Sequence, residues 1–354
     1  DKWEKYFVFS FIFYFSVIAI NLWWFDGKLH DLDTPSRLLL VLPIFFFIRK
    51  TNINSNWFIW GVVATSFMVG VNQVALYLNY NTLYFFQDNS GIMTLFASIL
   101  GLMSLLFISN KKSKIANFLF FSVAILGVTS SFMLGGRGVW IAAIMSLVFI
   151  GIVNPMNWSG GARGFILGFF VGIFVITYLV PQTGVKDRLT QATSNVAQWS
   201  ESGKSDTSAG ARLEMWKASY QVIKENPFFG VGEDNYSKYQ QILVNQGKVS
   251  KSVEGFLHPH GEYVTSLVEQ GFIGLIAFIS VLLTPLIYLL CRIKLNKNSY
   301  RQRVLTTSGL LIILHYAFYS VTSGVFDHQS TALFYSVFMV VILGLIKSNS
   351  RIEV

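Results

Sequence analysis

Apolar runs long enough to cross a lipid bilayer dominate this chain and restrict the folds that it can adopt. Of the 354 residues, 53% are hydrophobic and 13% are charged, whereas a soluble domain carries about 25% charged residues. Backbone polar groups in lipid must be hydrogen-bonded within their own segment, so each such run predicts a transmembrane helix. The sequence therefore predicts an all-α integral membrane protein. The runs, about ten in number, lie at residues 6–25, 36–49, 56–79, 92–109, 115–134, 138–154, 163–181, 264–291, 304–323 and 330–347.

A polar insert interrupts this apolar pattern. Residues 181–262 hold nine basic and nine acidic side chains and no apolar run of membrane length. The chain is thus predicted to divide into N-terminal transmembrane helices at 1–180, a polar loop with amphipathic helices at 181–262, and C-terminal transmembrane helices at 263–354. The insert is the segment with enough polar chemistry to carry an activity.

Basic residues in the short connections predict the orientation of the chain. Alternate connections hold 15 of the 27 Lys and Arg residues, whereas the opposite short connections hold Lys28, Arg37 and Arg137. Short cytoplasmic loops are enriched in Lys and Arg, so both termini are predicted to be cytoplasmic and the insert periplasmic. The net charge of +9 follows from this topology and does not indicate a nucleic-acid partner. The same rule places on the outward face residues 26–37, Asp88, Gly135, Asp327 and His328.

The first residue and the single cysteine of the sequence each support an expectation about the chain. The sequence begins at Asp1 without a signal peptide ahead of the first helix, so we expect further N-terminal residues in the natural chain. An added helix pair would give about twelve helices and keep the orientation. The single cysteine, Cys291, excludes a disulfide within the chain and a cysteine-based metal cluster.

An arginine lies at a predicted helix junction on the outward face. Gly-Gly-Arg-Gly at residues 135–138 separates two apolar runs. A helix N-terminus offers free backbone N–H groups that suit an anion, and arginine adds a bidentate, permanently charged donor for phosphate. The alternative is that Arg137 extends to the membrane surface only to keep its charge in water. The sequence leaves both interpretations open.

The middle of the insert predicts a helix over residues 211–225. Its apolar side chains recur at helical spacing on one face, at Leu213, Trp216, Tyr220 and Ile223. Thr207 or Ser208 can cap its start, and Pro227 follows its end. Arg212 then lies in the first turn, where it either meets an anion or stays solvated on a helix at the membrane surface. Residues 200–210 are predicted to form a flexible loop, and 236–244 a second short helix.

The insert ends with two histidines, in the sequence His-Pro-His-Gly-Glu at residues 258–262. Histidine titrates near neutral pH, which suits it to proton transfer, so His260 is a candidate general base. His258, His260 and Glu262 also carry metal-ligating groups, but their spacing differs from helical zinc motifs and proline prevents a helix there. A histidine resting at the membrane interface is the third interpretation.

Three segments of the chain resemble the O-antigen ligase/polymerase superfamily. They are SFMLGGRGVWIAAI at 131–144, SAGARLEMWKASYQVIKENPFFGVGEDNY at 208–236 and HPHGEYVTSLVEQGFIG at 258–274. Weaker similarity covers residues 31–43, where Thr34 replaces an arginine that is common in the family. Gly261 follows His260 where the family usually has asparagine. The resemblance implies a multi-helix membrane glycosyltransferase architecture with one large periplasmic loop, in the bacterial inner membrane.

The resemblance also implies a reaction and roles for particular residues. Ligase-type members transfer O-antigen from undecaprenyl diphosphate to lipid A–core, with inversion and without a metal or a nucleotide sugar. His260 corresponds to the essential histidine, and Arg137 and Arg212 to the two arginines that contact the diphosphate. We place five further residues as candidates for substrate binding: His258, Glu262, Lys217, Trp216 and Tyr236. Glu262 is a candidate to fix the tautomer of the histidine, and the aromatic residues either stack on sugars or anchor the loop at the interface.

Other functions share much of this pattern. A polymerase that joins lipid-linked repeats, or a transferase that moves glycan to protein, would use the same arginines, histidine and donor. A non-catalytic transporter of lipid-linked sugar is the alternative from another class. It predicts internal repeats and charged residues inside the helix bundle, and the sequence has neither.

Overall fold

The computed structural model describes residues 2–78, 90–109, 112–134, 136–153, 158–202, 205–295 and 299–350. Within these ranges all regular secondary structure is helical and there is no strand, as the sequence predicts. Asp88 and Gly135, both placed on the outward face by the charge pattern, lie outside the described residues.

In the described part of the chain, six helices are long and apolar enough to cross a membrane, so the chain is a multi-pass membrane protein. They are α1 (Lys2–Trp24), α4 (Asn56–Tyr77), α6 (Lys114–Leu134), α8 (Gly160–Leu179), α13 (Gly271–Leu295) and α15 (Gln329–Ser350). Two apolar helices are shorter, α5 (Ser90–Leu105) and α7 (Arg137–Val153), and α14 (Tyr300–Tyr319) completes the set.

Two predicted spans are divided in the structure. The run at 36–49 forms two short helices, α2 (Asp33–Leu40) and α3 (Leu42–Ile48). The run at 264–291 forms α12 (Glu262–Glu269) and then α13, which begins at Gly271. Gly271 has a φ of 70°, and a Cβ there would lie 2.3 Å from the carbonyl of Phe228. The close approach of this turn therefore ends α12, and Glu269 lies ahead of the membrane helix.

The chain forms two compact units. The first unit comprises Asp1–Val41, Lys186–Pro285 and Ser320–Ser336, and the second comprises Leu42–Val185, Leu286–Tyr319 and Val337–Val354. In the second unit α5 packs on α4 and α6, and α7 packs on α14. His315 of α14 contacts the hydroxyls of Ser98 and Ser146 at 3.0 and 2.8 Å. This is a hydrogen-bonded contact between helices.

The insert is more helical than its polar sequence predicts. Its elements are η3 (Pro181–Thr183), α9 (Val185–Ser202), α10 (Ser208–Glu225), η4 (Glu233–Asn235), α11 (Tyr236–Asn245) and η5 (Lys251–Val253). The prediction of a flexible loop from residue 200 was wrong at its start, because α9 continues to Ser202. Trp199 of α9 donates a hydrogen bond to Glu214 of α10 at 2.9 Å. The Thr207 hydroxyl caps α10, accepting from Gly210 N at 3.1 Å, and this predicted cap is confirmed.

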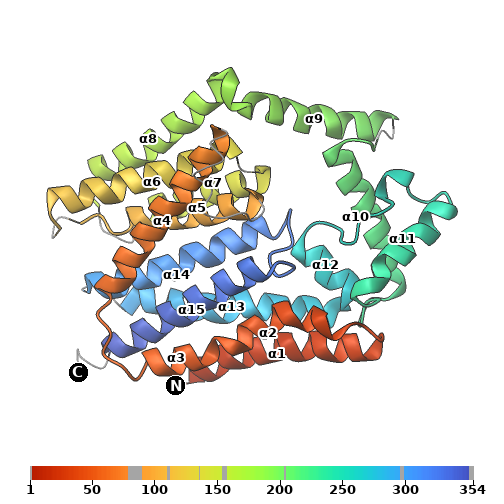
Figure 1. The fold of residues 1–354 in the computed structure, drawn as a ribbon, viewed down its shortest axis with the longest axis horizontal. Helices are drawn as coiled ribbons and strands as arrows, with labels where there is room; N and C mark the ends of the chain where they lie inside the picture. The colour runs from red at the N-terminus through yellow and green to blue at the C-terminus, as the bar shows by residue number, and fades with distance from the viewer. Residues whose placement is uncertain are drawn as a thin grey trace. The chain divides into compact units, whose positions relative to one another are not determined.

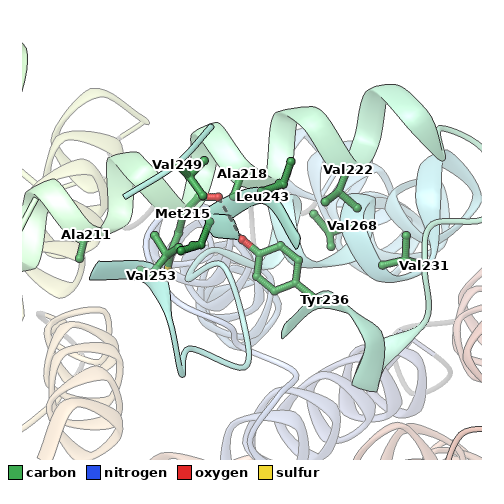
Figure 2. Packing of buried hydrophobic residues seen from close by; sticks show 11 residues of the cluster. Ala211, Met215, Ala218, Val222, Val231, Tyr236, Leu243, Val249, Val253 and Val268 are labelled. Atoms are coloured by element: carbon green, nitrogen blue, oxygen red, sulfur yellow. Dashed lines mark hydrogen bonds between the residues drawn. The ribbon is translucent and has the colours of Figure 1, made fainter. Parts of the chain in front are cut away.

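A compact apolar core holds the insert together in the first unit, where α10 lies against α11 and α12 (Figures 1 and 2). We call it the insert core; its residues are Ala211, Met215, Ala218, Val222, Val231, Tyr236, Leu243, Val244, Val249, Val253 and Val268. The predicted apolar face of α10 was therefore offset, since Tyr220 is 64% exposed and Met215 is buried. Ala211 and Ala218 are small, so neighbouring elements can approach α10 closely on this side.

Candidate functional site

The loop that carries the histidines is held in an unusual backbone conformation. His260 has a φ of 53° and Gly261 a φ of 129°. A positive φ is uncommon for a residue other than glycine and is often found at functional sites. A Cβ at Gly261 would lie 2.8 Å from the carbonyl oxygen of Val321. The family's usual asparagine would not fit this backbone, which accounts for glycine at this position.

Trp216 of α10 fastens the loop. Its indole Nε1 donates hydrogen bonds to the carbonyls of Pro259 and His260, each at 3.1 Å. The N–H group of the indole is therefore already hydrogen-bonded to the backbone of the loop. The predicted alternatives for Trp216 were sugar stacking and interface anchoring, and the structure adds the positioning of the loop.

His260 occupies a site that favours its neutral form. The residue is half-buried, and its ring meets Phe256 edge-on with the centroids 5.8 Å apart. Burial lowers the pKa of His260, and the nearby positive charges of Arg212 and His258 lower it further. A neutral imidazole at pH 7 can accept a proton. The environment of His260 thus favours the form of the ring that can accept a proton.

Arg212 approaches this loop from α10. Because α10 begins at Ser208, Arg212 lies one turn further into the helix than the sequence predicted. The effect of the helix dipole fades beyond the first turn, so the guanidinium itself supplies the positive charge. Arg212 is half-buried, close enough to His260 to affect its pKa.

His258 has a buried acidic partner that the sequence analysis missed. Its Nδ1 lies 3.1 Å from Oε1 of Glu269, whose side chain is 5% exposed. The hydrogen bond to Glu269 raises the pKa of His258 to about 9, and burial raises the pKa of Glu269 to about 7. His258 is therefore protonated at neutral pH and donates to Glu269. The sequence did contain a signal for this pair. Glu269 is an isolated acidic residue in the apolar run at 264–291, and an acidic residue in such a run usually has a partner.

Glu262 has a different role from the predicted one. It is buried, and its Oε2 accepts hydrogen bonds from the backbone N–H groups of Val325 and Phe326 at 2.7 and 3.0 Å. The carboxyl therefore joins α12 to residues 325–326, a contact that the sequence did not predict. Burial raises the pKa of Glu262 well above its usual range, and the charge of Asp327 adds to this.

A polar cavity of about 240 Å³ opens beside these residues in the first unit. We call it the acidic cavity, because five carboxyl groups line it. Burial raises the pKa of one of them, Glu233, to about 8. Its lining residues are Tyr14, Ile18, His30, Asp31, Thr34, Pro35, Glu233, Glu262, Thr265, Glu269, Gln270, Phe326, Asp327 and Gln329.

Two other candidates, Tyr236 and Lys217, make contacts within the insert. Tyr236 is fully buried in the insert core, where its hydroxyl donates to the Met215 carbonyl at 3.0 Å and contacts the Ser219 hydroxyl at 2.9 Å (Figure 2). The ring is therefore enclosed and not exposed for the predicted stacking on a sugar, because the helices of the insert pack around a core of their own. Lys217 is exposed and pairs with Glu214 at 3.7 Å.

Arg137 is the first residue of α7 and follows Gly136, so the predicted helix N-terminus is present. The residue is partly buried. It belongs to the second unit, whereas Arg212 and His260 belong to the first. Their convergence on one diphosphate remains a prediction. Within the described ranges, no three His, Cys, Asp or Glu side chains are grouped so as to hold a metal ion.

Comparisons with known proteins bear on this set of residues. A family model described as "O-Antigen ligase" matches residues 122–279. The matched range contains Arg137, Arg212 and His260. A protein from Haemophilus influenzae named "Uncharacterized protein" is 27% identical over 344 residues, which cover 94% of this chain and 84% of that protein. Its similarity extends over both units.

Proposed function

We propose that this chain, whose residues 122–279 match a family model described as "O-Antigen ligase", is a membrane glycosyltransferase of that superfamily and transfers O-antigen from undecaprenyl diphosphate to lipid A–core on the periplasmic face. The observation that carries the proposal is the neutral, half-buried imidazole of His260 beside the guanidinium of Arg212. This pairing supplies a base and a cation from two parts of the first unit, the loop before α12 and helix α10.

The proposed reaction is a single displacement that inverts the anomeric centre. The acceptor hydroxyl attacks the anomeric carbon, and His260 takes the proton of that hydroxyl. The bond from the anomeric carbon to the diphosphate oxygen breaks, and its electron pair leaves with the diphosphate. General-base assistance contributes about 10²–10⁴-fold to the rate.

The leaving diphosphate requires positive charge. Arg212 and Arg137 are proposed to bind it, because a guanidinium matches phosphate oxygens in a bidentate way. Loss of one such donor costs about 10²–10³-fold. The residues of this chain thus provide the charge stabilisation as well as the base, and no resident metal is required by the proposal.

The acceptor of the sugar distinguishes the proposed ligase from the alternative enzymes. A polymerase would use a second lipid-linked repeat, and a protein glycosyltransferase a protein hydroxyl, with the same donor chemistry. A transporter of lipid-linked sugar would need no base at all. The lowered pKa of His260 therefore favours an enzyme over a transporter.

Reconstitution tests the proposal. Purified protein in proteoliposomes receives undecaprenyl-diphosphate glycan and one of three acceptors: lipid A–core, a second lipid-linked repeat, or an acceptor protein. We expect transfer to lipid A–core, its loss in His260→Ala, and full activity in His328→Ala, a control at an exposed histidine of the first unit. Transfer to another acceptor alone would reject the ligase assignment. Undiminished transfer by His260→Ala would reject the base.

A further inference from the structure

The acidic cavity lies next to the loop that carries His260. Glu262 lines the cavity two residues after His260, and Glu269 lines it while contacting His258 at 3.1 Å. Neither carboxyl has a part in the proposed chemistry. The cavity therefore extends the site into a region that the base and the arginines leave unused.

The cavity wall holds polar groups without partners. Thr265 is 2% exposed and lines the cavity, and its Oγ1 has no hydrogen-bond partner among the residues that the structure describes. Oδ2 of Asp31, on the same wall, is also buried without a partner. Buried polar groups are nearly always hydrogen-bonded, to the protein, to water or to a ligand. The unused donor and acceptors can thus form hydrogen bonds with a ligand that carries hydroxyl groups.

The size and charge of the cavity restrict that ligand. Its volume of about 240 Å³ is below the roughly 300–1,000 Å³ of sites that enclose drug-sized molecules, which suits a single sugar ring. Carboxyl groups disfavour a phosphate or a uronate by like-charge repulsion. Burial keeps Glu233 largely protonated at neutral pH, because its pKa is about 8, and a neutral carboxyl can donate to a hydroxyl.

We propose that the acidic cavity is the acceptor subsite, and that it binds one uncharged, unphosphorylated sugar ring through its hydroxyl groups. Thr265, Asp31 and Glu233 are the residues that contact this ring. The inference rests on the proposed function and specifies the chemical class of its acceptor. Under this proposal, the acidic cavity selects the acceptor sugar that is extended, and the arginines do not.

A binding experiment tests the cavity without any transfer reaction. The full chain in nanodiscs is titrated with methyl glycosides of glucose, galactose and mannose, and with glucose 6-phosphate, by saturation-transfer NMR. We expect at least one methyl glycoside to bind, and glucose 6-phosphate not to bind. Thr265→Val keeps the shape of the side chain and removes the hydroxyl, so it should weaken binding about two- to tenfold.

The matched control is Thr307→Val. Thr307 is also fully buried with an unpartnered Oγ1, but it lies in α14 of the second unit and does not line the cavity. Its binding of the glycosides should equal that of the wild type. The proposal is overturned if no methyl glycoside binds, if Thr265→Val binds as well as the control, or if glucose 6-phosphate binds more tightly. Uptake of Ca²⁺ that is lost in Glu233→Gln would overturn it in favour of a cation site.

Steady-state transfer separates this proposal from the proposed function. Thr265→Val should raise the KM for the acceptor about two- to tenfold and leave the KM for the donor unchanged. An unchanged acceptor KM rejects the subsite while the ligase assignment stands. Absence of transfer by the wild type to any acceptor rejects the proposed function, and glycoside binding then still decides whether the cavity recognises sugar.

Discussion

At the scale of single residues, the two histidines of the 258–262 loop differ in charge at neutral pH. His258 is protonated through its contact with Glu269, and His260 is neutral through burial and the charge of Arg212. Two histidines that are two positions apart thus differ in protonation at neutral pH. Their environments, and not their spacing, identify the candidate base.

Substitutions of Arg212 should separate its effect on His260 from its contact with diphosphate. Removing its charge, as in Arg212→Gln, raises the pKa of His260. Activity requires the deprotonated base, so the acid limb of the pH–kcat profile should move to higher pH. Arg212→Lys keeps the charge and the position of the limb but loses the bidentate fork, so only the rate should fall. A limb that stays in place in Arg212→Gln contradicts the assignment of His260.

The pair of His258 with Glu269 should make stability depend on pH. Folding raises the pKa of His258 from 6.5 to about 9, so the contribution of this histidine is complete below pH 6.5 and is lost as pH rises through 9. The pKa of Glu269, which burial raises from 4.5 to about 7, adds a decline in stability between pH 4.5 and 7. His258 is 36% exposed in its side chain, so solvent screening reduces the effect to about 1–2 kcal/mol. Thermal unfolding in nanodiscs between pH 6 and 10 measures it.

Glu269→Gln is the control for this dependence. It keeps the size of the side chain and removes the charge, so the decline of the melting temperature between pH 6.5 and 9 should flatten. An equally steep decline in Glu269→Gln would mean that another group is responsible.

At the scale of elements, α10, α12 and the loop before α12 form one assembly. Trp216 of α10 holds the loop by two hydrogen bonds, and Glu262 of α12 binds the backbone at Val325 and Phe326. The backbone carbonyl of Glu269, at the end of α12, accepts hydrogen bonds from the backbone N–H of Gly232 at 2.9 Å and from the side-chain amide of Asn21 at 3.1 Å. The loop of His260 is therefore fastened at both of its ends.

Two glycines allow the fastening of the loop to be tested. Gly261 and Gly255 both have positive φ, at 129° and 88°, but a Cβ meets the Val321 carbonyl only at Gly261 and open space at Gly255. Both alanine variants carry backbone strain, and Gly261→Ala adds a clash beneath His260. We expect Gly261→Ala to lose transfer activity at least tenfold more than Gly255→Ala, measured with equal amounts of folded protein. Equal losses would show that strain alone matters.

At the scale of the whole molecule, the proposed function requires the insert and Arg137 to face the same side of the membrane. A periplasmic reporter such as alkaline phosphatase inserted at Gly247, an exposed turn after α11, should be active. The same insertion at Ser113, ahead of α6, should be inactive, because its basic neighbours predict the cytoplasmic side. The reverse result would overturn the topology and, with it, the proposed access to a periplasmic acceptor.

The sequence by itself determined the class of fold and the candidate segments. Apolar runs report on the solvent of each segment directly, so the all-α membrane architecture could be predicted from composition and length. The cap of α10 at Thr207 and the following helix at Tyr236–Asn245 are also local, since they depend on neighbouring residues. Arg212 and His260 were located in the same way, by their short motifs.

Only the tertiary structure decided what surrounds these residues. The partner of His258 is Glu269, eleven positions away, and Glu262 binds a segment more than sixty positions away. The acidic cavity is lined from three separate parts of the chain, and the buried face of α10 depends on what packs against it. Burial and charge at a site are sums over neighbours in space, so local sequence patterns report the side chains that are present but not the protonation that they adopt.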